Sequence, residues 1–393
     1  MERVTAALVG GPMYDPLYEL IPAFTRQTGI GVDVVVQLPH PELNAWVRRT
    51  FASGAAGGVD LLSTHTKYAP SQAQWLSDLD DVVAAADLDD LLPRPAALAR
   101  IDGHLLQVPR NVDVRLLHYR RDLLPNGAPS TWSELAAAAT AATTDGCAGF
   151  LFPGRDSGLF GTFYELLVGA GGELFHDDLS PAFESPAGVW AVAFLVDLYA
   201  VRRVAPRALV DWHYDEISAE FRAGRAAMVC DWPGSYHLYR NPSTCRVAGA
   251  MELALLPAGP AGSRSGYGGC HSFAIPRTAK NREGAASLMR FFTSHAAQLL
   301  EARAGSIPCR ASALARVRDE SAGHRAESSR WELLAVSQQG MIVPPRFAAY
   351  PACEDAIWRA VQRAMREELP PARAVALAAA DVRRLVNEVA RPS

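Results

Sequence analysis

The feature that most constrains this chain is the regular alternation of short apolar runs with longer amphipathic segments in its first sixty residues. The apolar runs, rich in β-branched side chains, lie at residues 4–9, 32–36 and 59–62. Between them, residues 16–28 and 41–52 carry apolar side chains at helical spacing. Strand, helix and strand in this order favour a largely parallel sheet covered by helices, which is the α/β class of fold.

Local signals mark the ends of the first helical segment. Asp15 followed by Pro16 predicts a helix start, with Asp15 as the N-cap and Pro16 in the first turn. Pro22 should bend or restart this helix because it cannot donate a backbone hydrogen bond. Gly29 predicts the end of the helix.

The same alternation continues along the rest of the chain. A capping box from Thr131 to Glu134 opens an alanine-rich helix. Further strands are expected at 104–108, 113–119, 148–152, 226–230 and 267–275. Further helices are expected at 157–168, 283–292 and 296–302, after Ser185-Pro186, and over most of the chain from 331 onward. No internal repeat and no long low-complexity linker interrupts this pattern.

Charge and composition exclude several classes of function. The net charge is -4 and no long basic run occurs, so the electrostatic footprint of a nucleic-acid-binding protein is missing. No apolar run is long enough to cross a bilayer. Lysine occurs only at Lys67 and Lys280, and neither lies in the Gly-Lys-Ser/Thr pattern of a P-loop. We therefore expect no nucleic-acid partner and no nucleotide cofactor.

Motifs for catalysis and metal binding are also missing from the sequence. It contains neither HExxH nor GxSxG, and the glycine-rich stretch at 266–271 ends in His271 where a dinucleotide fingerprint needs glycine. The ten histidines show no metal-ligand spacing, and none of the six cysteines forms a CxxC pair. Of the possible disulfides, Cys230 with Cys245 has a short connection. We predict no catalytic residue, cofactor or metal site, although a carboxylate pair would leave no local motif.

Five stretches, in this order, resemble one known family: 20–32, 102–135, 221–228, 268–276 and 285–308. They include the runs Asp102-Gly103-His104, Phe221 to Met228, and Gly305-Ser306-Ile307-Pro308. The chain resembles the family 1 extracellular solute-binding proteins, the sugar-binding group that includes maltose-binding protein. The resemblance implies a two-lobe, type II periplasmic-binding-protein-like fold with the ligand between two α/β lobes. By position, lobe one would comprise 1–110 plus 267–308, and lobe two 111–266 plus 309–393.

The same resemblance implies a function. The chain would be the solute-binding protein of a bacterial ABC importer, would capture a carbohydrate, polyol, sugar acid or sugar derivative by hinge closure, and would deliver it to membrane permeases as a monomer. The alternatives are a sensory or partner-binding protein and an enzyme on the same two-lobe scaffold. Residues 1–9 do not form a signal peptide, so we expect an extracytoplasmic protein whose leader is absent from this chain; a cytoplasmic protein remains the alternative.

Candidate ligand residues lie in loops at the ends of predicted strands, where α/β folds bind ligands. A sugar needs hydrogen-bonding groups and a flat apolar platform. Trp232, which follows a predicted strand and precedes Pro233-Gly234, is the leading platform candidate; its alternative role is a core tryptophan. Tyr14 could instead pack as a hydrophobic staple, and the other polar candidates could be solvated loop residues. The predicted ligand-binding residues are Tyr14, His65, Asn111, Arg155, Asp156, Trp232, Gly268, Gly269 and Arg346.

Overall fold

The computed structural model describes residues 2–54 and 58–390, and the chain divides into two compact units. Unit 1 comprises Met1–Asp113, Gly269–Trp331 and Arg346–Ala348. Unit 2 comprises Val114–Gly268, Glu332–Pro345 and Ala349–Ser393. The chain passes from one unit to the other within β7 (Asn111–Val114), within β12 (Gly266–Gly269) and within α15 (Arg325–Gln339).

Unit 1 is built on a five-stranded sheet with the order β2-β1-β3-β13-β6. The first three strands are parallel, as the alternating pattern predicts, whereas β13 is antiparallel to both of its neighbours. The strands of this sheet are β1 (Arg3–Val9), β2 (Gly31–Leu38), β3 (Leu61–His65), β6 (Val108–Pro109) and β13 (His271–Ala274). The expected strand at 267–275 is thus two strands, β12 and β13, separated at Cys270.

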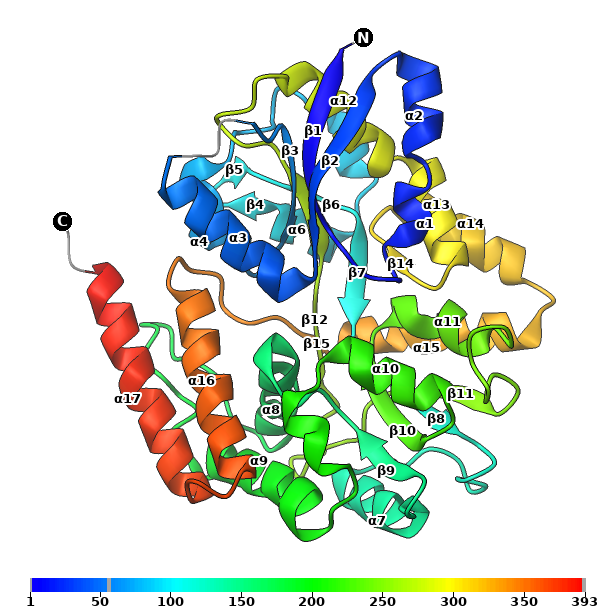
Figure 1. The fold of residues 1–393 in the computed structure, drawn as a ribbon, viewed down its shortest axis with the longest axis vertical. Coiled ribbons are helices and arrows are strands. Elements are labelled where there is room, and N and C mark those ends of the chain that lie inside the picture. Colours follow the sequence, from blue (N-terminus) through cyan, green and yellow to red (C-terminus); the bar gives the residue numbers. More distant parts are fainter. Residues whose placement is uncertain (1, 55–57, 391–393) are drawn as a thin grey trace. The chain divides into compact units, whose positions relative to one another are not determined.

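Alternate residues of β1 supply two separate cores, as the period of a strand requires. Val4, Ala6 and Leu8 belong to one apolar cluster, and Ala7 and Val9 to the other. The main helices of unit 1 are α1 (Asp15–Tyr18), α2 (Ile21–Thr28), α3 (His40–Ala52), α12 (Arg282–Phe292), α13 (His295–Arg303) and α14 (Ala311–Ser321). Shorter elements are α4 (Ala69–Gln72), α5 (Ala85–Asp89), α6 (Pro93–Ala99), β4 (Arg100–Ile101), β5 (His104–Leu105) and β14 (Ile307–Pro308). Figure 1 shows α2 beside β2 and α12 behind β1.

The first helix restarts where proline requires it. Pro22 lies in the first turn of α2, and Gly29 ends that helix with φ 72°, a left-handed conformation that favours glycine. The expectation that Asp15 is an N-cap is wrong: Tyr14 holds that position without a side-chain cap, and Asp15 is already helical. Proline is tolerated at either of the first two helical positions, so the position of Pro16 did not determine which residue is the N-cap.

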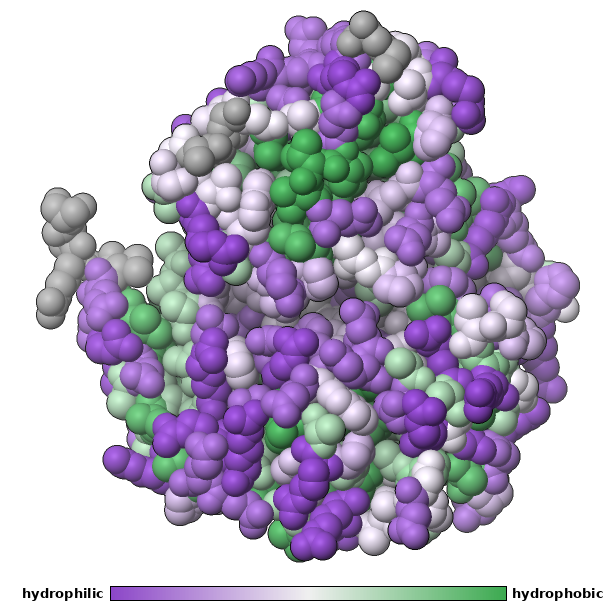
Figure 2. Space-filling view, viewed as in Figure 1, coloured by the Kyte–Doolittle hydropathy of each residue, from purple (hydrophilic) through white to green (hydrophobic). Residues whose placement is uncertain are grey.

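The edge strand β2 of unit 1 carries an exposed apolar surface. Its register with β1 shifts between Ala6 and Ala7, which leaves Val35 without a paired residue. Val34 and Val35 are among the exposed large apolar side chains, with 39% and 54% of their surface accessible. Figure 2 shows hydrophobic colouring over this part of unit 1. The irregular pairing bends an edge that could otherwise template further strands.

Unit 2 contains a four-stranded sheet with the order β11-β8-β10-β9, in which β10 is parallel to β9 and antiparallel to β8. The predicted cap of α7 is present: the Thr131 hydroxyl accepts a hydrogen bond from the Glu134 amide, while the Glu134 carboxylate accepts one from the Ser130 amide. The strands are β8 (Leu116–Arg120), β9 (Ala148–Leu151), β10 (Ala226–Asp231), β11 (Met251–Ala254) and, beside β12, β15 (Met341–Ile342). The helices are α7 (Trp132–Ala142), α8 (Asp156–Gly169), α9 (Pro186–Val196), α10 (Tyr214–Arg222), α11 (Tyr236–Arg240), α16 (Tyr350–Met365) and α17 (Pro371–Ala390).

The units differ from the expected lobes at three short segments, 111–113, 267–268 and 346–348, and in one longer segment. Residues 309–331, which the sequence placed in lobe two, belong to unit 1. The reason is local pairing: the Arg310 guanidinium forms ion pairs with Asp87 and Asp90, and Ser312 at the start of α14 donates to Asp90. These contacts hold α14 against unit 1, and the chain passes into unit 2 within α15, after Trp331.

Two further observations concern expected features. All six cysteines are free, so Cys230 and Cys245 form no disulfide. Among the helices that the structure describes, none is both long and apolar enough to cross a membrane.

Candidate functional site

Three imidazole rings gather in unit 1 and form what we call the imidazole group: His40, His65 and His271. His65 ends β3 and His271 begins β13, and the antiparallel register of these strands places the two residues opposite each other. His40 begins α3. The ring centroids are 5.3 Å apart for His40 and His65, and 5.0 Å apart for each of the other two pairs. The sequence analysis found no metal-ligand spacing among the histidines. His65 and His271 are 206 positions apart and meet only through strand pairing, which leaves no local spacing pattern in the sequence.

The three rings of the imidazole group pack as aromatic groups do. Within residues 2–54 and 58–390, no cluster of three or more histidine, cysteine or acidic side chains has metal-binding geometry. The rings instead meet edge to face or tilted, which is the usual packing of aromatic groups.

The His65 ring is neutral and presents a hydrogen-bond donor. Its Nδ1 accepts a hydrogen bond from the Lys67 amide at 3.2 Å, so the proton of the neutral ring lies on Nε2. Burial lowers the pKa of His65 well below its ordinary value, and the neighbouring His271 and His40 lower it further. Gly269 makes room for this ring, since a Cβ at that position would lie 2.4 Å from His65 Cε1.

A chain of polar contacts links His271 to the strand that leaves unit 1. The Tyr14 hydroxyl lies 3.0 Å from His271 Nε2, and the same nitrogen lies 3.5 Å from Asp113 Oδ2. The Asn111 amide donates to Asp113 Oδ1 at 2.9 Å. Tyr14 and Asn111 were predicted ligand residues, whereas His271 and Asp113 were missed. Asp113 is the first residue of the predicted strand 113–119 and not a loop residue, so the loop criterion passed over it.

Burial disfavours the charged forms of Asp113 and His271. Desolvation raises the pKa of Asp113 to about 7, and desolvation together with the positive charges of Arg110 and Lys67 lowers the pKa of His271 to about 3. Two buried atoms, His271 Nδ1 and Asn111 Oδ1, have no hydrogen-bond partner in the described structure. Each such atom costs about 1–3 kcal/mol when unsatisfied, so both favour contact with a polar ligand or water.

Unit 2 carries a second feature, an aromatic group made of Tyr214, Trp232 and Tyr267. Trp232 follows β10 and contacts Tyr214 at a centroid distance of 5.3 Å and Tyr267 at 6.1 Å. Tyr267 is buried, whereas Trp232 is only half-buried. A half-buried indole supported by two tyrosine rings offers a flat apolar face, as a sugar platform requires.

A buried ion pair between Arg115 and Glu165 contacts both tyrosines of the aromatic group. Arg115 and Glu165 have no exposed side-chain surface and form two hydrogen bonds, one of them 2.9 Å long. Arg115 Nη1 also donates to the Tyr214 hydroxyl at 3.2 Å, and Glu165 Oε1 accepts the Tyr267 amide at 2.7 Å. Gly161 of α8 leaves space for the Tyr267 ring, since a Cβ there would lie 2.4 Å from Tyr267 Cδ1.

Four predicted ligand residues lie outside both groups. Arg155 precedes α8, pairs with Asp156 and donates to the Asp211 carbonyl, so both side chains of this pair are engaged locally. Arg346 donates to the carbonyls of Leu98 and Arg100 and thereby ties the segment 346–348 to α6 and β4. Gly268 lies in β12 beside Tyr267 and is buried. The structure thus gathers Tyr14, His65, Asn111 and Gly269 in unit 1 and leaves Trp232 as the central candidate in unit 2.

With this geometry in place, comparison with known proteins assigns the chain. A family model described as bacterial extracellular solute-binding protein matches residues 19–326. The chain belongs to this family. The α/β fold is that of the type II periplasmic binding proteins: maltose-bound MalE3 of T. maritima is 27% identical, the match covers 98% of this chain and 100% of that one, and the TM-score is 0.90.

Curated relatives of this solute-binding protein agree with the family. A probable ABC transporter-binding protein of Deinococcus radiodurans is 26% identical over 295 residues, which cover 72% of this chain and 70% of the relative. A mannitol-binding protein of Pseudomonas aeruginosa is 24% identical over 56% of this chain and 52% of its own length. These relatives and the similar structures are binding proteins.

Proposed function

We propose that this solute-binding protein captures a carbohydrate or polyol outside the cytoplasmic membrane and delivers it to the permease subunits of an ABC importer. The observation that carries the choice of solute is the aromatic group, in which half-buried Trp232 rests on Tyr214 and Tyr267. Such a surface suits the C–H face of a sugar or polyol. MalE3, which was solved with maltose, and the mannitol-binding relative support the same class of solute.

The imidazole group supplies the hydrogen bonds that a polyhydroxylated solute needs. Neutral His65 offers an Nε2 donor, while His271 Nδ1 and Asn111 Oδ1 offer unused capacity. Because these groups are uncharged near neutral pH, they suit neutral hydroxyls. The protein would act as a monomer without a cofactor, and capture would proceed by closure about the strands that connect the units.

Calorimetric titration against a panel of maltose, other neutral disaccharides, mannitol, ribitol, sugar acids and sugar phosphates tests this proposal. We expect at least one neutral sugar or polyol to bind and to raise the melting temperature, because a ligand of the native state stabilises that state. Binding of only the anionic members would contradict the proposed class of solute. If no member binds, while the protein melts cooperatively, the assignment to carbohydrates and polyols fails.

A further inference from the structure

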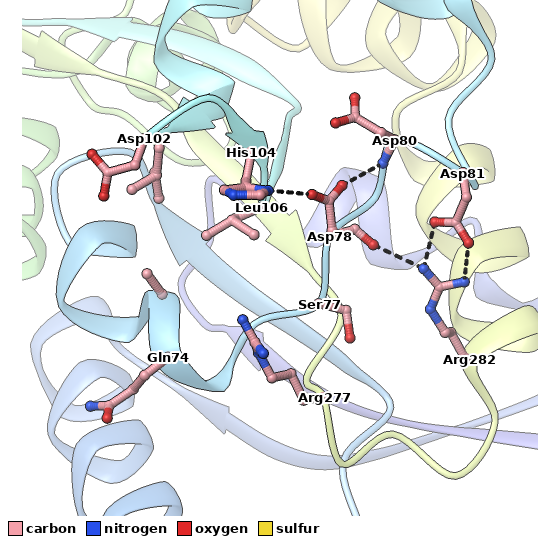
Figure 3. A pocket seen from close by; sticks show the side chains of 12 residues that line it. Gln74, Ser77, Asp78, Asp80, Asp81, Asp102, His104, Leu106, Arg277 and Arg282 are labelled. Atoms are coloured by element: carbon pink, nitrogen blue, oxygen red, sulfur yellow. Dashed lines mark hydrogen bonds and ion pairs between the residues drawn. The ribbon is translucent and has the colours of Figure 1, made fainter.

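Unit 1 contains a pocket of about 820 Å³ that is separate from the imidazole group. Its walls come from the segment that follows α4, the hairpin formed by β4 and β5, and the loop between β13 and α12. The buried side chains of Ile101 and Leu106 provide an apolar floor. A volume of this size is within the usual range for small-molecule sites. Figure 3 shows the polar side chains that surround this floor.

One half of the pocket is lined by charges that already have partners. Asp78 Oδ2 lies 2.7 Å from His104 Nδ1. Arg282 donates two hydrogen bonds to the Asp81 carboxylate, at 2.6 and 2.9 Å, and a third to the Asp78 carbonyl at 2.9 Å. The dashed lines in Figure 3 trace this network. Because each of these charges is compensated, this half forms a fixed wall and has little capacity to hold an ionic ligand.

The other half contains a cation and an anion, both exposed, that have no ion-pair partner among the described residues. The Arg277 guanidinium donates from Nε to the Leu76 carbonyl at 2.9 Å, which anchors it, and no carboxylate among the described residues pairs with it. Asp102 forms neither a hydrogen bond nor an ion pair in the described part of the chain; its charge acts on Arg346 only from beyond ion-pair distance. In Figure 3, Arg277 reaches toward the middle of the pocket. Asp102 lies at the edge of the view, farther from Arg277 than Leu106 is.

We propose that this pocket binds a small zwitterion with an apolar body, namely an α-amino acid or a short peptide with an aliphatic side chain. The two free Nη groups of Arg277 suit the two oxygens of a carboxylate. Asp102 accepts an ammonium group, and the aliphatic side chain covers Ile101 and Leu106. A phosphate ester would meet the nearby aspartates as a dianion, and a neutral sugar would cover both charges without pairing either. The site lies within unit 1 and does not depend on the proposed transport function.

Four probes separate the parts of this recognition: leucine, leucyl-leucine, N-acetylleucine and leucinamide. In calorimetric titrations of the whole protein, we expect leucine or leucyl-leucine to bind, and the comparison of the two identifies the source of the zwitterion. N-acetylleucine lacks the ammonium group and leucinamide lacks the carboxylate. Each should bind at least about tenfold more weakly, since each loses one charge-assisted contact. Absence of binding by both zwitterions at about 10 mM, roughly the weakest useful affinity, would overturn the proposal.

Substitutions at the two charges provide the second test. Arg277→Ala and Asp102→Asn should each weaken zwitterion binding about tenfold or more. Asp102→Asn retains the hairpin, because asparagine before Gly103 tolerates the φ of 50° found there. Arg318→Ala, which removes an exposed arginine of α14 outside the pocket, is the matched control and should bind as the unmodified protein does. If N-acetylleucine binds as tightly as leucine, or if Arg277→Ala binds normally, the assignment is wrong, whatever the carbohydrate panel shows.

Discussion

Replacement of Trp232 with alanine gives the sharpest test of the aromatic group. The indole contacts Tyr214 and Tyr267 and is only partly buried, so the empty protein should lose only part of a core tryptophan's contribution. Aromatic pairs contribute about 0.5–1.5 kcal/mol beyond buried area. With two such pairs in a half-wet position, we expect a loss of about 1–2 kcal/mol of unfolding free energy, compared with about 3–5 kcal/mol for a tryptophan in a closed core.

Binding should suffer more than stability. Without the platform, the solute loses one stacking contact and the apolar area beneath it, at about 25 cal/mol per Å². The sum is about 2–3 kcal/mol, or roughly a hundredfold in affinity. Calorimetric titration with the sugar or polyol identified by the panel, together with denaturant melts, measures both quantities.

Trp190→Ala is the matched control for this substitution. Trp190 is also half-buried in unit 2 and stacks on Phe194 at a centroid distance of 5.3 Å, but it lies in α9, away from the aromatic group. Its loss should lower stability by a similar amount and leave affinity unchanged. A Trp232→Ala protein that binds as the unmodified protein does, or that loses more than about 3 kcal/mol of stability, would refute the platform assignment and favour a core role.

Three further predictions concern the residues around the two groups. Because burial raises the pKa of Asp113 to about 7, the folded state binds a proton that the unfolded state releases near pH 4; this contribution to stability is full below about pH 4 and is lost as pH rises through about 7. Denaturant melts between pH 5 and 8 should therefore show Asp113→Asn becoming more stable relative to the unmodified protein as pH rises, and a difference independent of pH would contradict the raised pKa. Gly269→Ala should cost about 1–3 kcal/mol of stability and weaken solute binding, because the new Cβ overlaps His65; a neutral result in melts and titrations would show that the ring moves freely. Arg115→Met should cost about 3–5 kcal/mol by leaving Glu165 buried without its partner, and adding Glu165→Leu should recover part of that loss in the same melts; additive losses would exclude the proposed coupling.

Much of this fold follows from local physical chemistry that the sequence displays. The strand and helix alternation of the first sixty residues predicts the parallel arrangement of β1, β2 and β3, because periodicity reports which face of an element is buried. Pro22 divides α1 from α2 and Thr131 caps α7 for reasons that act within one turn of helix. Five stretches in a fixed order were enough to identify the family, because they reflect the order of the elements along the chain and not the contacts between them.

Only the tertiary structure decided which of these elements bring their polar groups together. His65 and His271 become neighbours through strand pairing, and Arg115 reaches Glu165 across fifty residues of chain. Loop position favoured Arg155, which instead forms an ion pair with its neighbour Asp156. It gave no hint that Arg277 would have no carboxylate partner within residues 2–54 and 58–390. Periodicity shows which side chains turn inward, but the partner of a buried or charged group is set by distances between elements far apart in the chain, and these exist only once the chain has folded.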